Sequence, residues 1–475
     1  MSFPDSVIQV LLTDADRIAV EHGPRTVTRG ELLAMIGRVA GGLRAAGLGP
    51  GSGVAMELDV SPESLAAYLA AYASGCRVLG VRPGLSRAQE RHLIDDGIEQ
   101  VLTDEAVAKL LRGPDEPVVV RAHPQDVARI IHTSGSTGRP KGCAQTYAAM
   151  SAHWSWGEWG PATADLAGRM DRYLLFGTLA SAVVQDFAAL CLLHGGTAVI
   201  PELGEGPLFP GVIERLRISA SIMNVPRLHQ MLAALREAAS REAASREKPV
   251  DTSSLQALVV SGSPLAPHRL AETVERLGPI VFQTYGQTET GNLALLTPDD
   301  IAKGVLDAVG RPQERVEIDI RDGEIFARSP YQMSGYWGDP EQTAEVLVDG
   351  WVRTRDLGHF DDAGFLHLTG RTRDVIIVDA LPVYAGPIEQ VLASLPDVDQ
   401  AYVVGTPDEH RGEAVHAFVV PRDGRVPEKA ALSNAVRDAL GESSVPKTIE
   451  FVPEAPMAPS GKPDKRALLT LYPRP

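Results

Sequence analysis

The chain has 475 residues, of which 44% are hydrophobic and 22% charged, and this length suggests about two to four domains. Its 61 acidic residues outnumber the 45 basic ones, so the net charge of −16 would repel a phosphate backbone and we expect no nucleic-acid partner. Three widely spaced cysteines, no basic leader and no apolar run of about 18 residues predict a cytoplasmic protein with no membrane partner.

Strand-like and helix-like segments alternate along the first part of the chain. Thr28 and Glu31 form a capping box before an apolar stripe with helical spacing, which ends at Gly47. Short apolar runs that predict strands follow at 54–58, 78–81, 118–121, 128–131, 173–176, 198–200 and 257–260. This alternation favours largely parallel sheets with helices on their faces.

Two later stretches have a different character. The repeated residues 236–247 carry Glu and Arg four positions apart and predict a solvated helical extension. From residue 316, short alternating runs between Gly and Asp turns predict a small antiparallel subdomain. After a boundary near Gly370, runs at 375–378, 401–404 and 415–420 and helical segments at 387–395 and 429–440 predict a separate α+β domain. The expected fold is therefore α/β, with a large N-terminal domain of βαβ sheets, an antiparallel subdomain and a small C-terminal domain.

The segment from Thr133 to Gly142, TSGSTGRPKG, is the most informative part of the sequence. Its candidate phosphate-binding residues are Thr133, Ser134, Gly135, Ser136, Thr137, Gly138 and Lys141. They follow an apolar run, so that backbone amides and hydroxyls could surround a polyphosphate, with Lys141 as a point charge. The segment is not a Walker A loop, because Lys141 follows a proline and precedes a glycine. The alternative interpretation of this segment is a flexible polar loop that has no function.

Five further motifs occur in a fixed order along the chain. They are SGSPL at 261–265, YGQTE at 285–289, GWVRTRDLG at 350–358, GRTRD at 370–374 and PSGKPDKRAL at 459–468. With these motifs the chain resembles the adenylate-forming superfamily of acyl-CoA synthetases, adenylation domains and luciferases. The resemblance implies an N-terminal domain over 1–370, a hinge over 371–374 with Arg373 and Asp374, and a mobile C-terminal domain over 375–475.

The resemblance also implies a role for each motif residue. Tyr285 would lie against adenine, Thr288 would contact the α-phosphate and Glu289 would ligate Mg²⁺. The backbone of Gly262, Ser263 and Pro264 would contact the adenine edge.

Three charged residues would complete the site of such an enzyme. Asp356 would accept hydrogen bonds from both ribose hydroxyls, Arg371 would donate near the ribose and phosphates, and Lys462 would enter the active site during adenylation. In isolation each would more often be a solvated surface charge, so the assignment depends on the surrounding motifs. Thr288, Glu289 and Lys462 are the catalytic candidates.

Some positions depart from the pattern of the superfamily. Arg355 stands where glycine usually precedes the ribose carboxylate, and residues 379–382 lack the glycines that commonly line a pantetheine tunnel. The stretch around Phe176 lacks a histidine that many relatives carry. The resemblance therefore implies ATP and Mg²⁺, whereas CoA or a phosphopantetheine thiol is an open question.

Three functions remain open on this basis. The leading hypothesis is a ligase that activates a small or medium carboxylic acid as acyl-AMP with pyrophosphate release, then transfers it to CoA or a carrier-protein thiol. The second is activation of another oxyanion, such as nitrite, to nitrosate or diazotise an amine with N–N bond formation. The third is a non-catalytic nucleotide-binding homologue. The substrate pocket is expected around Phe176, Asn224, Gln283 and Gly286.

Overall fold

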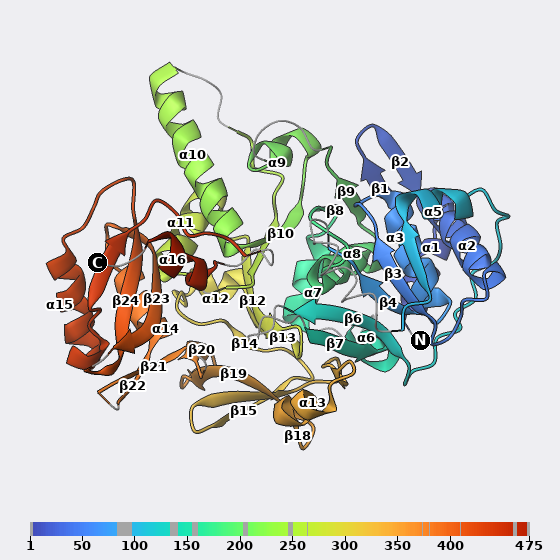
Figure 1. The fold of residues 1–475 in the computed structure, drawn as a ribbon. Coiled ribbons are helices and arrows are strands. Elements are labelled where there is room, and N and C mark those ends of the chain that lie inside the picture. The colour runs from blue at the N-terminus through green and yellow to red at the C-terminus, as the bar shows by residue number, and fades with distance from the viewer. Residues whose placement is uncertain are drawn as a thin grey trace.

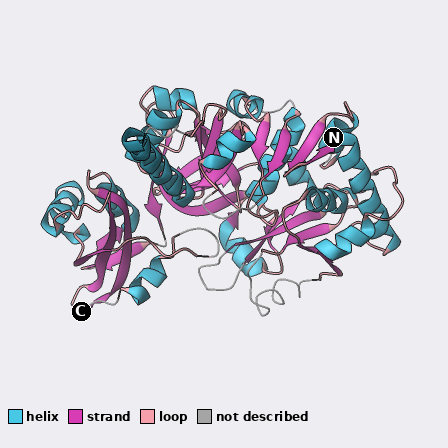
Figure 2. Ribbon diagram, turned by 90° about the horizontal axis from the view of Figure 1, so that it is seen from above, coloured by secondary structure: helices cyan, strands magenta, loops and turns pink. Residues whose placement is uncertain are grey.

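The computed structural model describes residues 3–82, 97–133, 141–153, 160–202, 208–245, 250–263, 265–372, 374–379, 381–408, 410–458 and 463–472. Figure 1 shows the N-terminal strands and helices on one side of the molecule and the C-terminal strands on the other. Helices flank the strands of the two largest sheets (Figure 2). Within the described ranges, no helix combines the length and the hydropathy needed to span a membrane.

The largest sheet in the described chain has nine strands in the order β14-β13-β12-β11-β10-β8-β9-β1-β2. They are β1 (Ile18–His22), β2 (Arg25–Thr28), β8 (Arg172–Leu174), β9 (Thr197–Ile200), β10 (Ala220–Asn224), β11 (Ala257–Ser261), β12 (Val281–Gln287), β13 (Gly291–Leu296) and β14 (Arg311–Pro312). The strands from β12 to β1 are parallel neighbours, and antiparallel strands close both edges. The carboxyl ends of β10, β11 and β12 therefore meet at one edge, where ligands of such sheets usually bind.

A second sheet, of six strands among the described residues, has the order β17-β7-β6-β4-β3-β5. Its members are β3 (Gly53–Glu57), β4 (Arg77–Gly80), β5 (Gln100–Thr103), β6 (Val127–Thr133), β7 (Lys141–Thr146) and β17 (Gly335–Tyr336). β6 and β7 are antiparallel, with Thr133, the first residue of the TSGSTGRPKG motif, opposite Lys141. β17 joins the other edge of β7 although it lies far away in the sequence.

Helices cover both sheets. They are α1 (Asp5–Leu12), α2 (Arg29–Ala45), α3 (Pro62–Ala73), α5 (Asp104–Leu110), α6 (Tyr147–His153), α7 (Pro161–Gly168), α8 (Ala182–His194), α9 (Gly211–Leu216), α10 (Val225–Ser245), α11 (Pro267–Leu277) and α12 (Pro298–Ala302). The predicted capping box is confirmed: Thr28 caps α2 and Glu31 bonds back to its backbone. The helix predicted from the repeat at 236–247 is present over residues 236–245 as the second half of α10, and residues 246 and 247 lie outside the described residues.

The strand predicted at 118–121 is wrong. These residues run alongside α3 without joining a sheet, and the Arg121 amide donates to the Ala73 carbonyl at 2.8 Å. Val118 packs against the apolar core, but Val119 is 58% exposed and the run pairs with no strand in the described chain. An apolar triplet alone does not make a strand when no sheet edge is available to pair with it.

The antiparallel subdomain and the C-terminal α+β unit are both present, and the predicted α/β fold is confirmed. The subdomain contains β15 (Glu317–Arg321), β16 (Glu324–Arg328), β18 (Leu347–Val348), β19 (Trp351–Phe360), β20 (Leu366–Arg371) and α13 (Pro340–Val346). The C-terminal unit contains β21 (Val375–Val378), β22 (Leu381–Tyr384), β23 (Val398–Asp408), β24 (Gly412–Pro421), β25 (Thr448–Phe451), α14 (Ala385–Ala393), α15 (Lys429–Leu440), a 3₁₀ turn (Glu442–Ser444) and α16 (Lys465–Leu471). It has its own apolar core between the sheet and helices α14 and α15.

The C-terminal unit contacts the rest of the chain through α10 and α11. His229 on α10 hydrogen-bonds Gln400 on β23 at 2.9 Å, and Arg269 on α11 forms an ion pair with Asp399. Burial, and then the nearby Arg269, lower the pKa of His229 to about 3. Burial, followed by Arg422, lowers the pKa of His268 to about 4. Both imidazoles are therefore neutral at pH 7.

Candidate active site

A buried carboxylate at the meeting point of β12, β19 and β20 organises the first half of the site. Asp356 is 3% exposed. Its Oδ2 accepts hydrogen bonds from the Tyr285 hydroxyl at 2.8 Å and the Gln287 amide at 2.7 Å, and its Oδ1 accepts from Arg371 Nε at 2.8 Å. We call these four residues the Asp356 cluster. Burial, and then the Asp356 charge, raise the pKa of Tyr285 well above its usual value, so the phenol remains a donor.

The backbone beside Asp356 explains why glycine is usual at the preceding position. Arg355 has φ of +61°, a left-handed conformation that favours glycine. The arginine side chain turns away from the Asp356 cluster and pairs with Glu345 of α13 at 3.0 Å. The Arg355 carbonyl accepts from the Thr372 amide at 2.9 Å, which fixes β20 and Arg371 beside β19. The departure from the motif is therefore accommodated without crowding the carboxylate.

A second cluster forms around the acid of the YGQTE motif. Glu289 Oε1 accepts a hydrogen bond from the Tyr336 hydroxyl at 2.9 Å, and the Lys141 ammonium lies 5.1 Å from the centre of the Tyr336 ring. These three residues form the Glu289 cluster. Burial, and then Glu289, raise the pKa of Tyr336. Tyr336 was not predicted to be a site residue. It reaches Lys141 only because β17 pairs with β7, and no local sequence pattern indicates that pairing.

The hairpin of β12 and β13 joins the two clusters. Tyr285 and Gln287 lie on β12, and Thr288 and Glu289 lie in the turn that follows. Gly286 allows the two strands to approach closely, since a Cβ atom there would lie 2.1 Å from the Gly291 carbonyl oxygen. A short turn thus places adenine, phosphate and metal candidates next to one another.

The remaining predicted residues lie partly outside the described chain. Ser134, Gly135, Ser136, Thr137, Gly138, Pro264, Arg373 and Lys462 lie outside the described residues. Thr133 ends β6, and Gly262, with φ of +93°, and Ser263 follow β11 at the edge where β12 carries Tyr285. The described structure therefore brings together Lys141, Glu289, Tyr285, Asp356 and Arg371.

The donor set suits a cation that is bound mainly by a nucleotide. No group of three or more His, Cys, Asp or Glu side chains converges within the described residues. Glu289 offers one carboxylate close to the strand that carries Lys141. Mg²⁺ in nucleotide-dependent enzymes is typically bound by one or two carboxylates plus substrate phosphates and waters. Glu289 fits that role.

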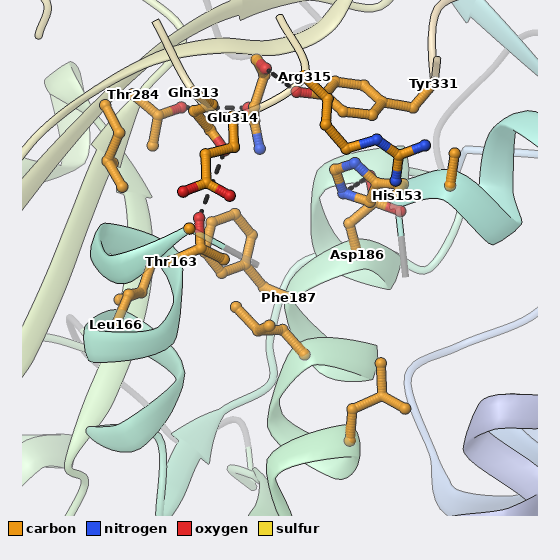
Figure 3. Close-up of a pocket in the computed structure, with 16 residues that line it drawn as sticks. His153, Thr163, Leu166, Asp186, Phe187, Thr284, Gln313, Glu314, Arg315 and Tyr331 are labelled. Carbon is orange, nitrogen blue, oxygen red and sulfur yellow. Dashed lines mark hydrogen bonds and ion pairs between the residues drawn. The ribbon is translucent and has the colours of Figure 1, made fainter. Parts of the chain in front are cut away.

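A cavity with about 830 Å³ of empty space, including open solvent, is lined in part by Thr284 of β12 (Figure 3). Its walls include Thr284 and Asn292 on the hairpin, Phe187 and Asp186 on α8, and His153 at the end of α6. Asp186 forms an ion pair with the buried Arg129 on β6 at 2.9 Å. Burial lowers the pKa of His153, so its imidazole is neutral at pH 7. The apolar part of the cavity wall comes mainly from α7 and α8, whereas residues 313–315, the hairpin and His153 supply polar groups.

Phe176, Asn224, Gln283 and Gly286, the four residues predicted to form the substrate pocket, do not line this cavity. Gln283 and Gly286 flank Thr284 on β12, and Gly286 pairs with Asn292. The buried Gln283 side chain has no hydrogen-bond partner for its Oε1 in the described part. Phe176 packs edge-on against Phe209 with ring centres 5.5 Å apart, and Asn224 caps the start of α10.

The segment expected to be the hinge is linked to the C-terminal helix. Lys465, the first residue of α16, lies 3.8 Å from Asp374 and 2.7 Å from the Glu389 carboxylate. Burial raises the pKa of Glu389, although the adjacent Lys465 acts in the opposite direction. Beyond the hinge, Asp379 in the turn between β21 and β22 has φ of +52° and pairs with Arg411 at 2.6 Å.

Comparison with known proteins establishes the family. Residues 9–109 and 96–337 match the AMP-binding enzyme family, and residues 387–462 match the AMP-binding enzyme C-terminal domain. The chain is 31% identical to a feruloyl-CoA synthase from an Amycolatopsis species over 94% of each chain, and 30% identical to the 2-succinylbenzoate–CoA ligase of Geobacillus kaustophilus over 100% of this chain and 99% of the relative.

Solved structures agree with this assignment. The amide bond synthetase McbA from Marinactinospora thermotolerans is 35% identical, covers 98% of this chain and 99% of its own, and superimposes with a TM-score of 0.85. The o-succinylbenzoate CoA synthetase MenE from Bacillus subtilis, in complex with its acyl-adenylate intermediate, is 26% identical over 98% of both chains, with a TM-score of 0.79. The chain thus belongs to the AMP-binding enzymes of the adenylate-forming superfamily and is an AMP-forming ligase.

Proposed function

We propose that the protein activates a carboxylic acid as its acyl-adenylate, with release of pyrophosphate from ATP. The observation that supports this most directly is the convergence of the Asp356 and Glu289 clusters on one hairpin, from segments far apart in the sequence. Together they offer acceptors for a ribose, an aromatic face for a base and a lysine for phosphates. A carboxylate oxygen of the acid would attack the α-phosphorus, and the bond to the pyrophosphate oxygen would break.

Each site residue has a defined task in this proposal. Lys141 and the loop 133–138 would hold the β- and γ-phosphates, and Thr288 would contact the α-phosphate. Lys462 would stabilise charge on the phosphoryl oxygens during attack. Glu289 would hold Mg²⁺, which supplies positive charge to the phosphates. The chain itself would contribute positioning and charge stabilisation rather than a covalent intermediate.

The cavity beneath β12 would receive the body of the acid. Thr284 and Asn292 in its wall belong to the hairpin whose turn carries Thr288, and this shared hairpin is what links the cavity to the α-phosphate candidate. Phe187, Leu190 and Leu295 in its walls favour an apolar body, whereas His153, Glu314 and Arg315 favour a polar substituent. Relatives named for ferulate, 2-succinylbenzoate and indoleacetate support a medium-sized aromatic acid.

The second half-reaction would deliver the acyl group to an acceptor. In the proposed domain arrangement, residues 375–475 rotate about 371–374 relative to residues 1–370 and remove Lys462 from the site. Transfer to the thiol of CoA or of a carrier protein is supported by relatives named as CoA ligases and as a fatty acid–[acyl-carrier-protein] ligase.

An amine is a second candidate acceptor. Asp379 occupies a left-handed position where the superfamily commonly has glycine, and its ion pair with Arg411 adds two side chains beside the expected thiol path. The similarity to an amide bond synthetase also favours an amine. No relative reported above is named for nitrite or for a non-catalytic role, so neither alternative is proposed.

A pyrophosphate-release screen would test this proposal. Aromatic and aliphatic acids, with nitrite as a comparison, would be incubated with ATP and Mg²⁺, with or without CoA and an amine, and products identified by mass spectrometry. We expect pyrophosphate with an aromatic acid and its loss in Lys462→Ala. Lys429→Ala is the matched control, since Lys429 is a half-exposed lysine on α15. Release of inorganic phosphate alone, or full activity of Lys462→Ala, would contradict the proposal.

A further inference from the structure

The Tyr336 side chain lies between the two charged residues that would flank the nucleotide phosphates. Its hydroxyl is 2.9 Å from Glu289 Oε1, and its ring centre is 5.1 Å from Lys141 Nζ. We propose that Tyr336 is a positioning residue for the magnesium–nucleotide complex, which orients the Glu289 carboxylate through its hydroxyl and supports Lys141 through its ring. This inference depends on the proposed role of Glu289 as the Mg²⁺ ligand.

Backbone contacts fix Tyr336 to both parts of the site. β17 pairs with β7 so that Tyr336 lies opposite Cys143, two residues after Lys141. The Trp337 amide donates to the Gly142 carbonyl at 2.7 Å. At the other end, the Met333 amide donates to the Glu289 carbonyl at 2.9 Å. The segment 333–337 therefore connects the start of β7 with the turn that bears Glu289.

The hydrogen bond leaves the carboxylate suited to a cation. Tyr336 occupies Oε1, and the described residues supply no hydrogen bond or ion pair to Oε2. A donor on one oxygen limits the rotation of the carboxylate and leaves the other oxygen available for a metal. Groups that orient metal ligands in this way commonly matter for affinity almost as much as the ligands do.

The ring has a separate effect on charge. No ion pair within 4.0 Å joins Lys141 to Glu289 in the described chain, although both lie against Tyr336. A direct ion pair would neutralise both side chains before the nucleotide arrived. With the aromatic ring between them, the ammonium and the carboxylate remain available for phosphate and metal respectively.

Isothermal titration of ATP binding at a series of Mg²⁺ concentrations, without any acid, tests this inference independently of catalysis. In Tyr336→Phe we expect the Mg²⁺ concentration for half-maximal ATP binding to rise about tenfold. Binding of ATP in EDTA should remain unchanged. Tyr147→Phe is the matched control: it removes a buried hydroxyl that donates to the Cys76 carbonyl at 2.7 Å, remote from Glu289, and should not alter the Mg²⁺ dependence.

A second variant separates positioning from a general structural role. In a Glu289→Gln background, Tyr336→Phe should cause no further change in Mg²⁺ dependence, because the positioned ligand is already gone. An unchanged Mg²⁺ midpoint in Tyr336→Phe, or the same rise in both backgrounds, would overturn the inference while leaving the proposed function intact. Absence of Mg²⁺-dependent ATP binding in the wild-type protein would overturn both.

Discussion

Replacing Asp186 by alanine should lower the free energy of unfolding by about 3–5 kcal/mol, because it leaves a buried arginine without its counter-charge. The Arg129 side chain is 4% exposed and that of Asp186 15%. The guanidinium donates to both carboxylate oxygens, at 2.9 and 3.2 Å. Burial alone would lower the pKa of Arg129, yet Asp186 raises it above the usual value. Gln145 and Gln185 would remain as acceptors but carry no charge.

Urea denaturation followed by tryptophan fluorescence suits this test. All five tryptophans precede residue 352, so the signal follows the larger part of the chain and not the C-terminal sheet. The double variant Arg129→Met/Asp186→Leu should be more stable than Asp186→Ala, because an apolar pair leaves no buried charge. A decrease of less than about 1 kcal/mol in the free energy of unfolding of Asp186→Ala would refute the reasoning. Additive effects of Arg129→Met and Asp186→Leu would refute it as well, because the two partners of a buried ion pair are expected to have a larger coupling free energy than that.

Three further predictions address the site and the contact between the two parts of the chain. Lys465→Ala should raise the pKa of Glu389 further, because it removes the adjacent positive charge. It should also slow pyrophosphate release, because Lys465 lies beside the proposed hinge and three residues after Lys462. ATP binding measured by calorimetry should stay unchanged. Acidification should weaken the contact of α10 and α11 with the C-terminal sheet. The pKa values of His229 and His268 are about 3 and about 4, below the ordinary value of 6.5. The stabilisation that comes from keeping these imidazoles neutral is therefore complete above pH 6.5 and is lost as the pH falls towards 4. Small-angle scattering from pH 7 to 4.5 should show expansion before the circular dichroism changes, and a constant radius of gyration would contradict this. Asp356→Asn should weaken ATP binding at least tenfold, about the effect of one charged hydrogen bond, whereas unchanged affinity would exclude Asp356 from the ribose site.

The order of the motifs was enough to predict the family, and hydrophobic periodicity was enough to predict most of the strands that form the sheets. Both signals are carried by residues that lie close together in the sequence. The capping box at Thr28 and the helix over 429–440 are examples, and both appear at the predicted residues. The apolar run at 118–121 did not form a strand, since strand formation depends on an available edge elsewhere in the chain. The residues around a short apolar run do not indicate whether such an edge is available.

The contacts that complete the site were less accessible to prediction. Tyr336 reaches Glu289 only because β17 adds to the edge of β7, and Asp186 reaches Arg129 only because α8 packs beside β6. Neither contact can be predicted from the spacing of residues in the sequence, because the partners lie on elements that the order of strands in the sheets brings together. The resemblance supplied the candidate ligand-binding residues, and the structure supplied the side chains that contact them.

Asp356 accepts three hydrogen bonds from protein side chains. A carboxylate offers about four acceptor positions, so two ribose hydroxyls cannot simply be added to Tyr285, Gln287 and Arg371. If Asp356 binds the ribose as proposed, nucleotide entry would be an exchange in which at least one resident donor withdraws. One ribose hydroxyl would then take the free acceptor position and the other would replace a resident donor, so the sugar would add about one hydrogen bond to Asp356. Discrimination against 2′-deoxy-ATP would depend on how readily the displaced donor finds another acceptor.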